Sequence, residues 1–248
     1  MSRVLPILFN TDMVRAILDG KKTVTRRICK DANELTVPDM SFYDAEKRTY
    51  AVHNYSNKEH TDKLSIAERT CPICPGDILY VRESVFQGVG HYLDVSGETV
   101  SVLTNDFEYY ADGLNEKGHW KDKYERTWMY RRPSIHMPKE AARIWLKVKD
   151  VRVERLQEIT EEQVDAEGFR FKPPCLSMVS ADGHYCDLDG PCTSSIKYCD
   201  MTMGELFGRE LWNSTIKKSD LDRYGWDASP WVWVIEFERC EKPEGWCV

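Results

Sequence analysis

The sequence lacks both a continuous apolar run and an excess of basic residues. The N-terminal stretch MSRVLPILFNTDMVRAIL is interrupted by proline and polar residues. It therefore contains no continuous apolar run long enough for a signal peptide or a membrane span. We therefore expect a cytoplasmic protein with no membrane partner. The 248-residue chain carries 34 Lys and Arg against 41 Asp and Glu, a formal net charge of -7. This balance argues against extended binding of a nucleic-acid backbone, so any anionic ligand must be bound by a local basic site.

The sequence also lacks internal repeats, low-complexity linkers, a glycine-rich phosphate-binding motif and a convincing Ser/His/Asp arrangement. We therefore predict a single domain over residues 1–248, with insertions around 30–70, 84–135 and 170–200. Nine cysteines, an odd number in a chain without an export signal, indicate reduced thiols rather than a disulfide framework.

Three short helices are predicted from capping and spacing. The stretch NTDMVRAILDG has Asn10 or Thr11 as N-cap, and Gly20 ends the helix. In TEEQVDAEG, Thr160 and Gln163 match a capping box, and the following glycine closes the helix. The third helix is expected in GELFGRELWNSTI.

Strands are predicted where apolar and polar residues alternate or β-branched residues prevail, in GDILYVRES, ARIWLKVKDVRVERL and PWVWVIEFER. The stretch TVSVLTNDFEYYAD predicts a hairpin about Asn105 and Asp106. Residues 30–70 and 111–135 are polar and predicted to be irregular. Short strands with a few short helices predict an α+β domain, most simply a small barrel or curled sheet with helices at its ends.

The stretch GKKTVTRR, residues 20–27, concentrates cations in an otherwise acidic chain. It follows a predicted helix C-terminus, where the dipole favours positive charge. One interpretation is an exposed edge strand whose charges discourage aggregation. The other is a ligand site, in which neighbouring cations and burial lower the pKa of one lysine towards neutrality, so that it can act as a base.

Four landmarks in this order resemble the ASCH-domain family of the PUA-like superfamily. GKKTVTRR matches the signature Gly-x-Lys-x-x-(Glu/Thr)-x-Arg, and PGDILYV, LQEITEEQVDAEG and WVWVIEFERC resemble the later landmarks. The sequence around these landmarks resembles that of the larger ASCH proteins of bacteriophages and prophages. The resemblance implies a PUA-like β-barrel with short flanking helices and long insertions, and a pocket for a nucleobase, a nucleoside or RNA. A phage-encoded protein would act in the cytoplasm of its bacterial host.

One branch of that family is an amidohydrolase that removes the acetyl group from N4-acetylcytidine with a Lys, a Thr and a Glu. The residues that match here are Lys22, Thr25 and Glu167. We assign Thr25 as nucleophile, Lys22 as its base and Glu167 as proton donor or orienting group. Substrate binding is assigned to four further side chains: Arg27, Arg26, Lys21 and Glu83. No cofactor is required for this chemistry.

Convergence of Lys22 and Thr25 sets a geometric condition. Positions three apart in a regular strand point to opposite faces, so a turn must separate the two residues. We therefore expect Lys22 in the turn that leaves the helix, and a strand that begins near Thr23 or Val24. Glu167 could equally be an exposed helix carboxylate.

Cysteines offer a candidate structural zinc site. Cys71 and Cys74 form a CxxC pair, and a cysteine-rich loop adds Cys186 and Cys192, which could complete four soft ligands. Reduced thiols without a metal are the alternative. His136 precedes a proline and is either packed in the core or presented at the rim of a pocket.

The leading hypothesis is therefore an amidohydrolase acting on an acylated or otherwise modified pyrimidine nucleoside, free or within RNA. The alternative is a non-catalytic PUA-like module that binds RNA or a modified base through the cationic cluster. A phage accessory or assembly protein without a small-molecule site is a third option. The net charge of -7 favours a small nucleoside over long RNA.

Overall fold

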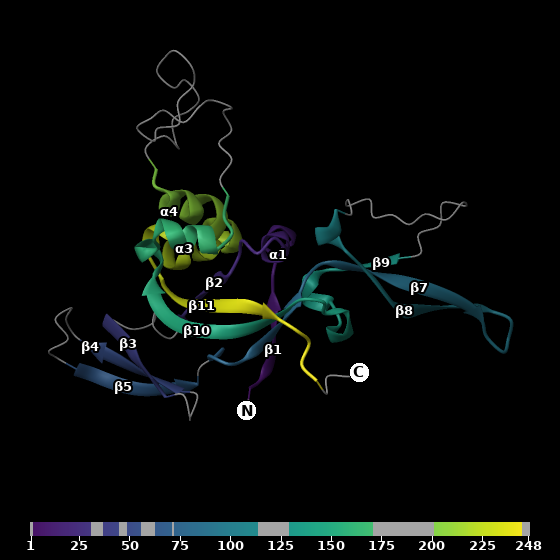
Figure 1. The fold of residues 1–248 in the computed structure, drawn as a ribbon, viewed down its shortest axis with the longest axis horizontal. Coiled ribbons are helices and arrows are strands. Elements are labelled where there is room, and N and C mark those ends of the chain that lie inside the picture. Colours follow the sequence, from purple (N-terminus) through teal and green to yellow (C-terminus); the bar gives the residue numbers. More distant parts are fainter. Residues whose placement is uncertain are drawn as a thin grey trace, which may run out of the picture. The chain divides into compact units, whose positions relative to one another are not determined.

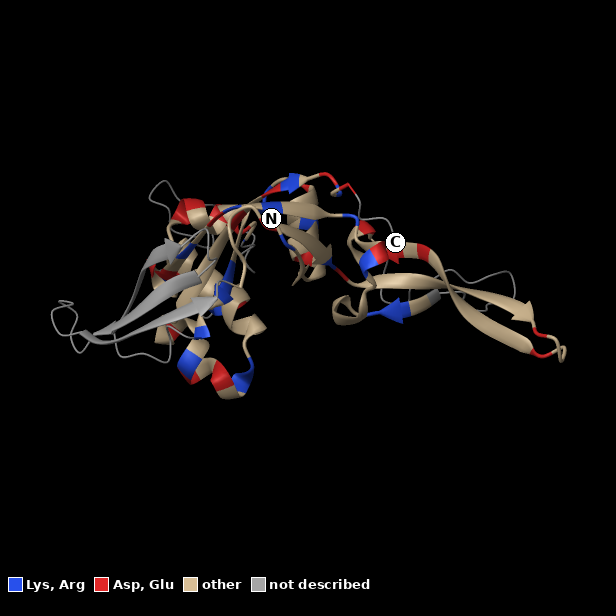
Figure 2. Ribbon diagram, turned by 90° about the horizontal axis from the view of Figure 1, so that it is seen from below, with Lys and Arg blue, Asp and Glu red and all other residues tan. Residues whose placement is uncertain are grey.

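The computed structural model describes most of the chain and divides it into two compact units (Figure 1). The described residues are 2–30, 37–44, 49–55, 63–70, 72–113, 129–170 and 201–244. Unit 1 comprises residues 1–20, 75–150 and 237–248, and unit 2 comprises residues 21–74 and 151–236. Acidic and basic residues are interspersed along the described ribbon (Figure 2).

The fold class is α+β, as predicted. The helical elements are α1 (Thr11–Leu18), η1 (Tyr110–Asp112), η2 (Ser134–His136), η3 (Lys139–Ala141), η4 (Leu156–Glu158), α3 (Glu161–Ala166), α4 (Met203–Leu206), η5 (Phe207–Trp212), α5 (Asn213–Thr215), η6 (Lys218–Asp220), α6 (Leu221–Tyr224) and η7 (Trp226–Ala228). The strands are β1 (Val4–Leu8), β2 (Val24–Ile28), β3 (Val37–Asp44), β4 (Thr49–Tyr55), β5 (Lys63–Thr70), β6 (Ile78–Arg82), β7 (Val85–Leu93), β8 (Thr99–Tyr109), β9 (Met129–Arg132), β10 (Trp145–Arg155) and β11 (Trp231–Cys240).

The strands form one mixed sheet of order β1-β6-β10-β11-β2 and two antiparallel sheets, β3-β4-β5 and β8-β7-β9. Among the described residues no closed barrel is found. Nor does any helix of the described chain have the length and apolar character needed to cross a membrane. The three strands predicted from alternation correspond to β6, β10 and β11, which confirms those predictions.

Unit 1 is built on β1, which pairs with β6 in parallel, and on the first part of β10, which pairs with β6 antiparallel. Its helix α1 begins as predicted, because the Asn10 side chain accepts a hydrogen bond from the backbone N–H of Met13 at 2.8 Å. Gly20 then takes a φ of 71°, the left-handed conformation expected just beyond a helix end.

The predicted hairpin about Asn105 and Asp106 is wrong. Both residues lie inside the continuous strand β8, which pairs with β7 in register from Val85↔Tyr109 to Leu93↔Thr99. The register shifts between Gln87 and Val89, so the turn-prone residues of β8 lie at an irregularity of the ladder. A bulge favours the same residue types as a turn, which explains the misassignment.

Unit 2 contains β2, which pairs with β11 antiparallel in the register Thr25↔Ile235 and Arg27↔Trp233. Its core gathers aliphatic and aromatic side chains from β2, α3, η5 and β11, including Val24, Val164, Phe207, Trp212 and Val234. This core holds β2 against α3 and so positions the side chains of the candidate site.

The prediction of irregular structure for residues 30–70 is wrong, because β3, β4 and β5 form a three-stranded antiparallel sheet there. TYAVHNY and KLSIAERT mix β-branched or aromatic residues with polar ones, so their strand propensity was masked by overall polarity.

Candidate functional site

Lys22 lies where the chain leaves a helix end and enters a strand. Lys22 forms an isolated antiparallel bridge with Glu167, and β2 begins only at Val24. The backbone N–H of Thr23 donates to the carbonyl of Ala166 at 2.8 Å, which fixes this approach. The expected start of the strand near Thr23 or Val24 is therefore confirmed, whereas Lys22 lies in a β-bridge beyond the turn at residues 19–20 and not in the turn itself.

Glu167 is placed by the C-terminus of α3. That helix begins with the predicted capping box, in which the Thr160 and Gln163 side chains each bond to the other's backbone N–H. Glu167 is its C-cap, and Gly168 follows with a φ of 74° and ends the helix as predicted. The short helix thus presents Glu167 to the start of β2.

Lys22 and Glu167 form a buried ion pair. The Lys22 Nζ donates to the Glu167 Oε2 at 2.5 Å and to the Glu167 backbone carbonyl at 3.0 Å. The two residues are only 2% and 4% exposed. Glu167 is therefore a buried partner of the cationic cluster, and the alternative of an exposed helix carboxylate is wrong.

Arg26, which lies in β2, donates a hydrogen bond to the same Glu167 carboxylate. Its Nη1 donates to the Glu167 Oε1 at 3.1 Å, and its Nη2 donates to the Gln163 Oε1 at 2.7 Å and lies 3.5 Å from the Glu154 Oε2. One carboxylate thus serves two buried cations. Removing this carboxylate would break the Lys22 ion pair, whereas Arg26 would keep its contact with Glu154.

The pKa of Lys22 is lowered from its ordinary value of 10.5. Burial is the main cause, and the positive charges of Arg27 and Arg26 add to it, while Glu167 acts in the opposite direction. A lysine in such surroundings gives up its proton more readily than one in water. The site therefore meets one requirement of a general base.

Thr25 and Arg27 form a separate pair on β2. Thr25 is fully buried at 0% exposed, and its Oγ1 accepts a hydrogen bond from the Arg27 Nη1 at 2.9 Å. The two residues are two apart and share a strand face, whereas Arg26 points to the other face. Burial lowers the pKa of Arg27 as well, with Glu167 acting against the shift.

The structure thus brings Lys22, Glu167 and Arg26 together and joins Thr25 to Arg27. Lys21, assigned to substrate binding, is exposed next to the buried pair. Glu83, also assigned to substrate binding, belongs to unit 1.

Glu83 forms a second buried acid–base cluster, within unit 1. Arg143 donates from Nε and Nη2 to the two Glu83 oxygens at 2.9 and 3.2 Å, and from Nη1 to Asp112 at 2.8 Å. Burial raises the pKa of Glu83 against the opposing effect of Arg143. Arg82, the sequence neighbour of Glu83, instead donates to backbone carbonyls.

The zinc prediction rests largely outside the described residues, because Cys71, Cys186 and Cys192 lie there. Cys74 is described and is buried. Within the described part of the chain, no group of three or more His, Cys, Asp or Glu side chains is placed to hold a metal ion. The zinc site stays a prediction.

Two participants in the buried network were not predicted from sequence as site residues, Gln163 and Glu154. Gln163 precedes Glu167 by four positions, so both lie on one face of α3, and that spacing was a usable signal. Glu154 comes from β10, and nothing local in the sequence indicates that it reaches Arg26.

The arrangement combines a buried amine of lowered pKa, a carboxylate that contacts it, and a buried hydroxyl held by a guanidinium. These groups can transfer a proton and support a developing negative charge. Comparison of the chain with protein-family models, with curated proteins and with solved structures finds no match.

Proposed function

We propose that the chain is an amidohydrolase that removes the acyl group from a modified pyrimidine nucleoside such as N4-acetylcytidine, free or within RNA. The observation that carries the proposal is the buried Lys22–Glu167 pair, with a lysine pKa lowered by burial. The resemblance of GKKTVTRR and the three later landmarks to ASCH domains supplies the substrate class and a PUA-like fold.

In the proposed reaction, Lys22 becomes neutral by passing its proton to Glu167 across their contact, and the Thr25 hydroxyl then attacks the acyl carbonyl while its proton passes to Lys22. This step requires bound substrate to bring the two side chains together, because Lys22 and Arg26 bond to Glu167, whereas Thr25 bonds to Arg27 on the other face of β2. The C–N bond then breaks as Lys22 donates that proton to the leaving cytidine amine, and the acyl group stays on Thr25 as an ester. Water, deprotonated in the same way, hydrolyses the ester and releases the carboxylic acid. Glu167 orients Lys22 through the 2.5 Å contact.

Arg27 has two tasks in this mechanism. Its hydrogen bond to Thr25 Oγ1 stabilises the negative charge that develops on this oxygen as it attacks. Its positive charge also supports the oxyanion of the tetrahedral intermediate. Lys22, Thr25 and Glu167 are buried in this structure, so turnover requires the substrate to displace the atoms that cover them.

The test is release of cytidine and acetate from N4-acetylcytidine by the full chain, followed by liquid chromatography. Thr25→Val keeps the shape of the side chain and removes the hydroxyl, so we expect turnover to be lost. Thr23→Val is the matched control, because Thr23 is exposed and contributes only its backbone N–H to the site. Equal activity of the two variants would overturn the assignment of Thr25.

A second candidate is a non-catalytic module that binds a modified base. It is favoured by one observation: the Thr25 hydroxyl bonds to Arg27, whereas the Lys22 amine bonds to Glu167. A binding module would retain N4-acetylcytidine without consuming it. Equilibrium dialysis of the intact nucleoside, with no cytidine formed over the incubation, would favour this alternative over the hydrolase.

A further inference from the structure

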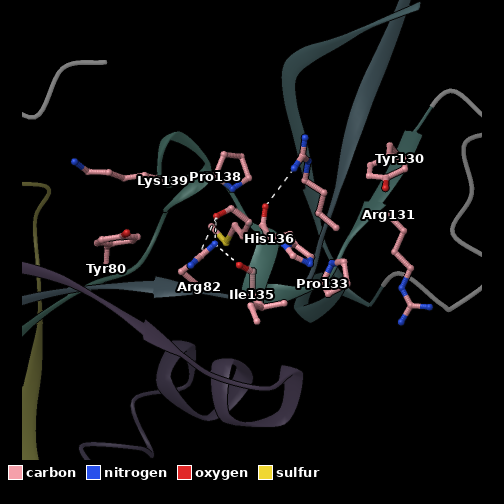
Figure 3. Close-up of a pocket in the computed structure, with 11 residues that line it drawn as sticks. Tyr80, Arg82, Tyr130, Arg131, Pro133, Ile135, His136, Pro138 and Lys139 are labelled. Carbon is pink, nitrogen blue, oxygen red and sulfur yellow. Dashed lines mark hydrogen bonds between the residues drawn. The ribbon is translucent and has the colours of Figure 1, made fainter.

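Unit 1 contains a cavity that is separate from the residues proposed for catalysis. Its volume is about 620 Å³, within the range of about 300–1,000 Å³ typical of small-molecule sites. Residues 130–139 line most of it, together with Tyr80 and Arg82 of β6 (Figure 3). The cavity therefore lies where β9 runs into the two short helices η2 and η3.

The charge of the cavity lining is opposite to that of the chain. The lining includes four cations, Arg82, Arg131, Arg132 and Lys139, and no Asp or Glu. The whole chain has a net charge of -7. A local basic site of this kind is what an acidic protein needs to bind an anion.

The Arg82 side chain is held in place by hydrogen bonds to neutral acceptors, which do not offset its charge. Its Nη2 donates to the carbonyls of Ile135 and Met137 at 2.5 and 2.9 Å, and its Nε donates to Met137 at 3.2 Å. These acceptors are neutral, and no carboxylate of the described chain forms an ion pair with Arg82. Its Nη1 keeps its two N–H groups for a ligand.

Arg132 is held in the same way. Its Nε donates to the Gln87 Oε1 at 2.5 Å and its Nη1 to the His136 carbonyl at 3.3 Å, so Nη2 is left for a ligand. Pro133 and Pro138 immediately precede η2 and η3 and restrict the backbone that supplies these carbonyls. Two guanidinium groups are thus oriented in advance, which reduces the entropy lost on binding.

Aromatic side chains flank the cations. Figure 3 shows Tyr80 and Lys139 on one side of the cavity and Tyr130 and Arg131 on the other, with Arg82 and His136 between them. Tyr130 is 58% exposed and the Arg132 guanidinium lies 5.7 Å from its ring centroid, so the exposed part of the ring can stack on a planar ligand beside that cation. His136 lines this pocket and is exposed. Of the two placements considered from the sequence, core or pocket rim, the structure has the rim.

We propose that this cavity binds the phosphate group and the base of a nucleotide. The guanidinium groups of Arg82 and Arg132 bind the phosphate, because arginine presents N–H groups that match phosphate oxygens. Lys139 and Arg131, on opposite sides of the cavity, add positive charge that attracts the anion (Figure 3). A tyrosine ring stacks on the base. The phosphate can belong to a free nucleotide or to a terminus of a strand, and the experiment below separates the two.

The test is isothermal titration of the full chain with AMP and with adenosine. A purine is chosen because the site proposed for catalysis takes a pyrimidine. We expect AMP to bind at least about tenfold more tightly than adenosine, since only AMP offers the charge-assisted contacts. Absence of AMP binding, or equal binding of the two, would overturn the proposal.

Location is tested with paired variants. Arg131→Gln with Lys139→Gln removes two cations from the lining without touching the hydrogen bonds of Arg82 and Arg132, and we expect about tenfold weaker AMP binding. Lys147→Gln with Lys149→Gln is the control, because both are exposed on β10 outside the cavity and the charge change is equal. Equal weakening by both pairs would show a non-specific charge effect and refute the site.

To identify the source of the phosphate, the affinities of inorganic phosphate and of oligo(A) are measured by the same titration and compared with that of AMP. Tighter binding of AMP than of inorganic phosphate supports the stacking contact, and equal binding refutes it. Tighter binding of oligo(A) than of AMP, with the same loss in the Arg131/Lys139 pair, assigns the phosphate to a strand. Because Lys22 and Thr25 take no part, these outcomes do not depend on N4-acetylcytidine turnover.

Discussion

Replacement of Glu167 by glutamine should destabilise the protein far more than replacement of Lys22 by methionine. The reason is the shared carboxylate: Glu167 accepts from Lys22 at 2.5 Å and from Arg26 at 3.1 Å, and it is only 4% exposed. Glu167→Gln removes the negative charge from both contacts at once. Lys22→Met removes a single cation, and Glu167 keeps Arg26.

The magnitudes follow from this asymmetry. Breaking a buried ion pair by removing one partner costs about 3–5 kcal/mol, and Glu167→Gln breaks the pair with Lys22 in this way. After Lys22→Met the carboxylate stays paired and an apolar side chain of similar length fills the site, so we expect a cost below about 2 kcal/mol. The double variant should be more stable than Glu167→Gln alone, because the buried ammonium that lost its ion-pair partner is gone.

The assay is urea unfolding followed by circular dichroism, with the free energy of unfolding extrapolated to water. Glu161→Gln is the matched control, since Glu161 lies exposed in the first turn of the same helix and its loss should cost no more than about 1 kcal/mol. Equal costs for Glu167→Gln and Lys22→Met, or a Glu167→Gln cost no larger than that of the control, would refute the shared-carboxylate reasoning.

Three further predictions concern pH and packing. Because the pKa of Lys22 is lowered in the folded protein, the unfolded chain binds more protons between that value and 10.5, so wild-type stability relative to Lys22→Met should rise with pH through this window in parallel urea titrations. The pKa of Glu83 is raised above 4.5, so the sign reverses: wild-type stability relative to Glu83→Gln should fall as pH rises from 4.5 through the folded-state value, and a rise would contradict it. A Cβ on Gly208 would lie 2.0 Å from the Trp226 ring, so Gly208→Ala should lower stability by about 1–3 kcal/mol in thermal unfolding, and an unchanged midpoint would contradict that packing.

The local features of the site were predictable from sequence because local rules govern them. Gly20 ends a helix, so Lys22 could be placed before the strand, and β2 begins at Val24. The capping box at Thr160 likewise sets the start of α3 and Gly168 its end, and together they position Glu167.

The partners of the site depend on tertiary structure and could not be predicted in the same way. Glu154 reaches Arg26 from a distant strand, and Glu83 bonds to Arg143 rather than to its neighbour Arg82. Such contacts follow from how strands are ordered in a sheet, which residue spacing does not specify.

Turn chemistry was the least reliable guide. Asn105 and Asp106 are typical of a hairpin turn, but β8 continues through them at a point where the ladder is irregular. Periodicity correctly predicted the strands β6, β10 and β11. It predicted two short strands in place of the single strand β8, because the centre of β8 is polar.

The most direct test of the central claim compares Lys22→Met with Lys21→Met in N4-acetylcytidine hydrolysis. The two lysines are adjacent, but Lys22 is buried against Glu167 and Lys21 is exposed. Loss of a general base costs about 10²–10⁴-fold, so the account predicts a fall in kcat of at least about 100-fold for Lys22→Met. Lys21→Met, which removes a substrate-binding residue, should raise KM and change kcat by no more than about twofold. Equal activity of the two variants, or no turnover by the folded wild-type protein, would contradict it.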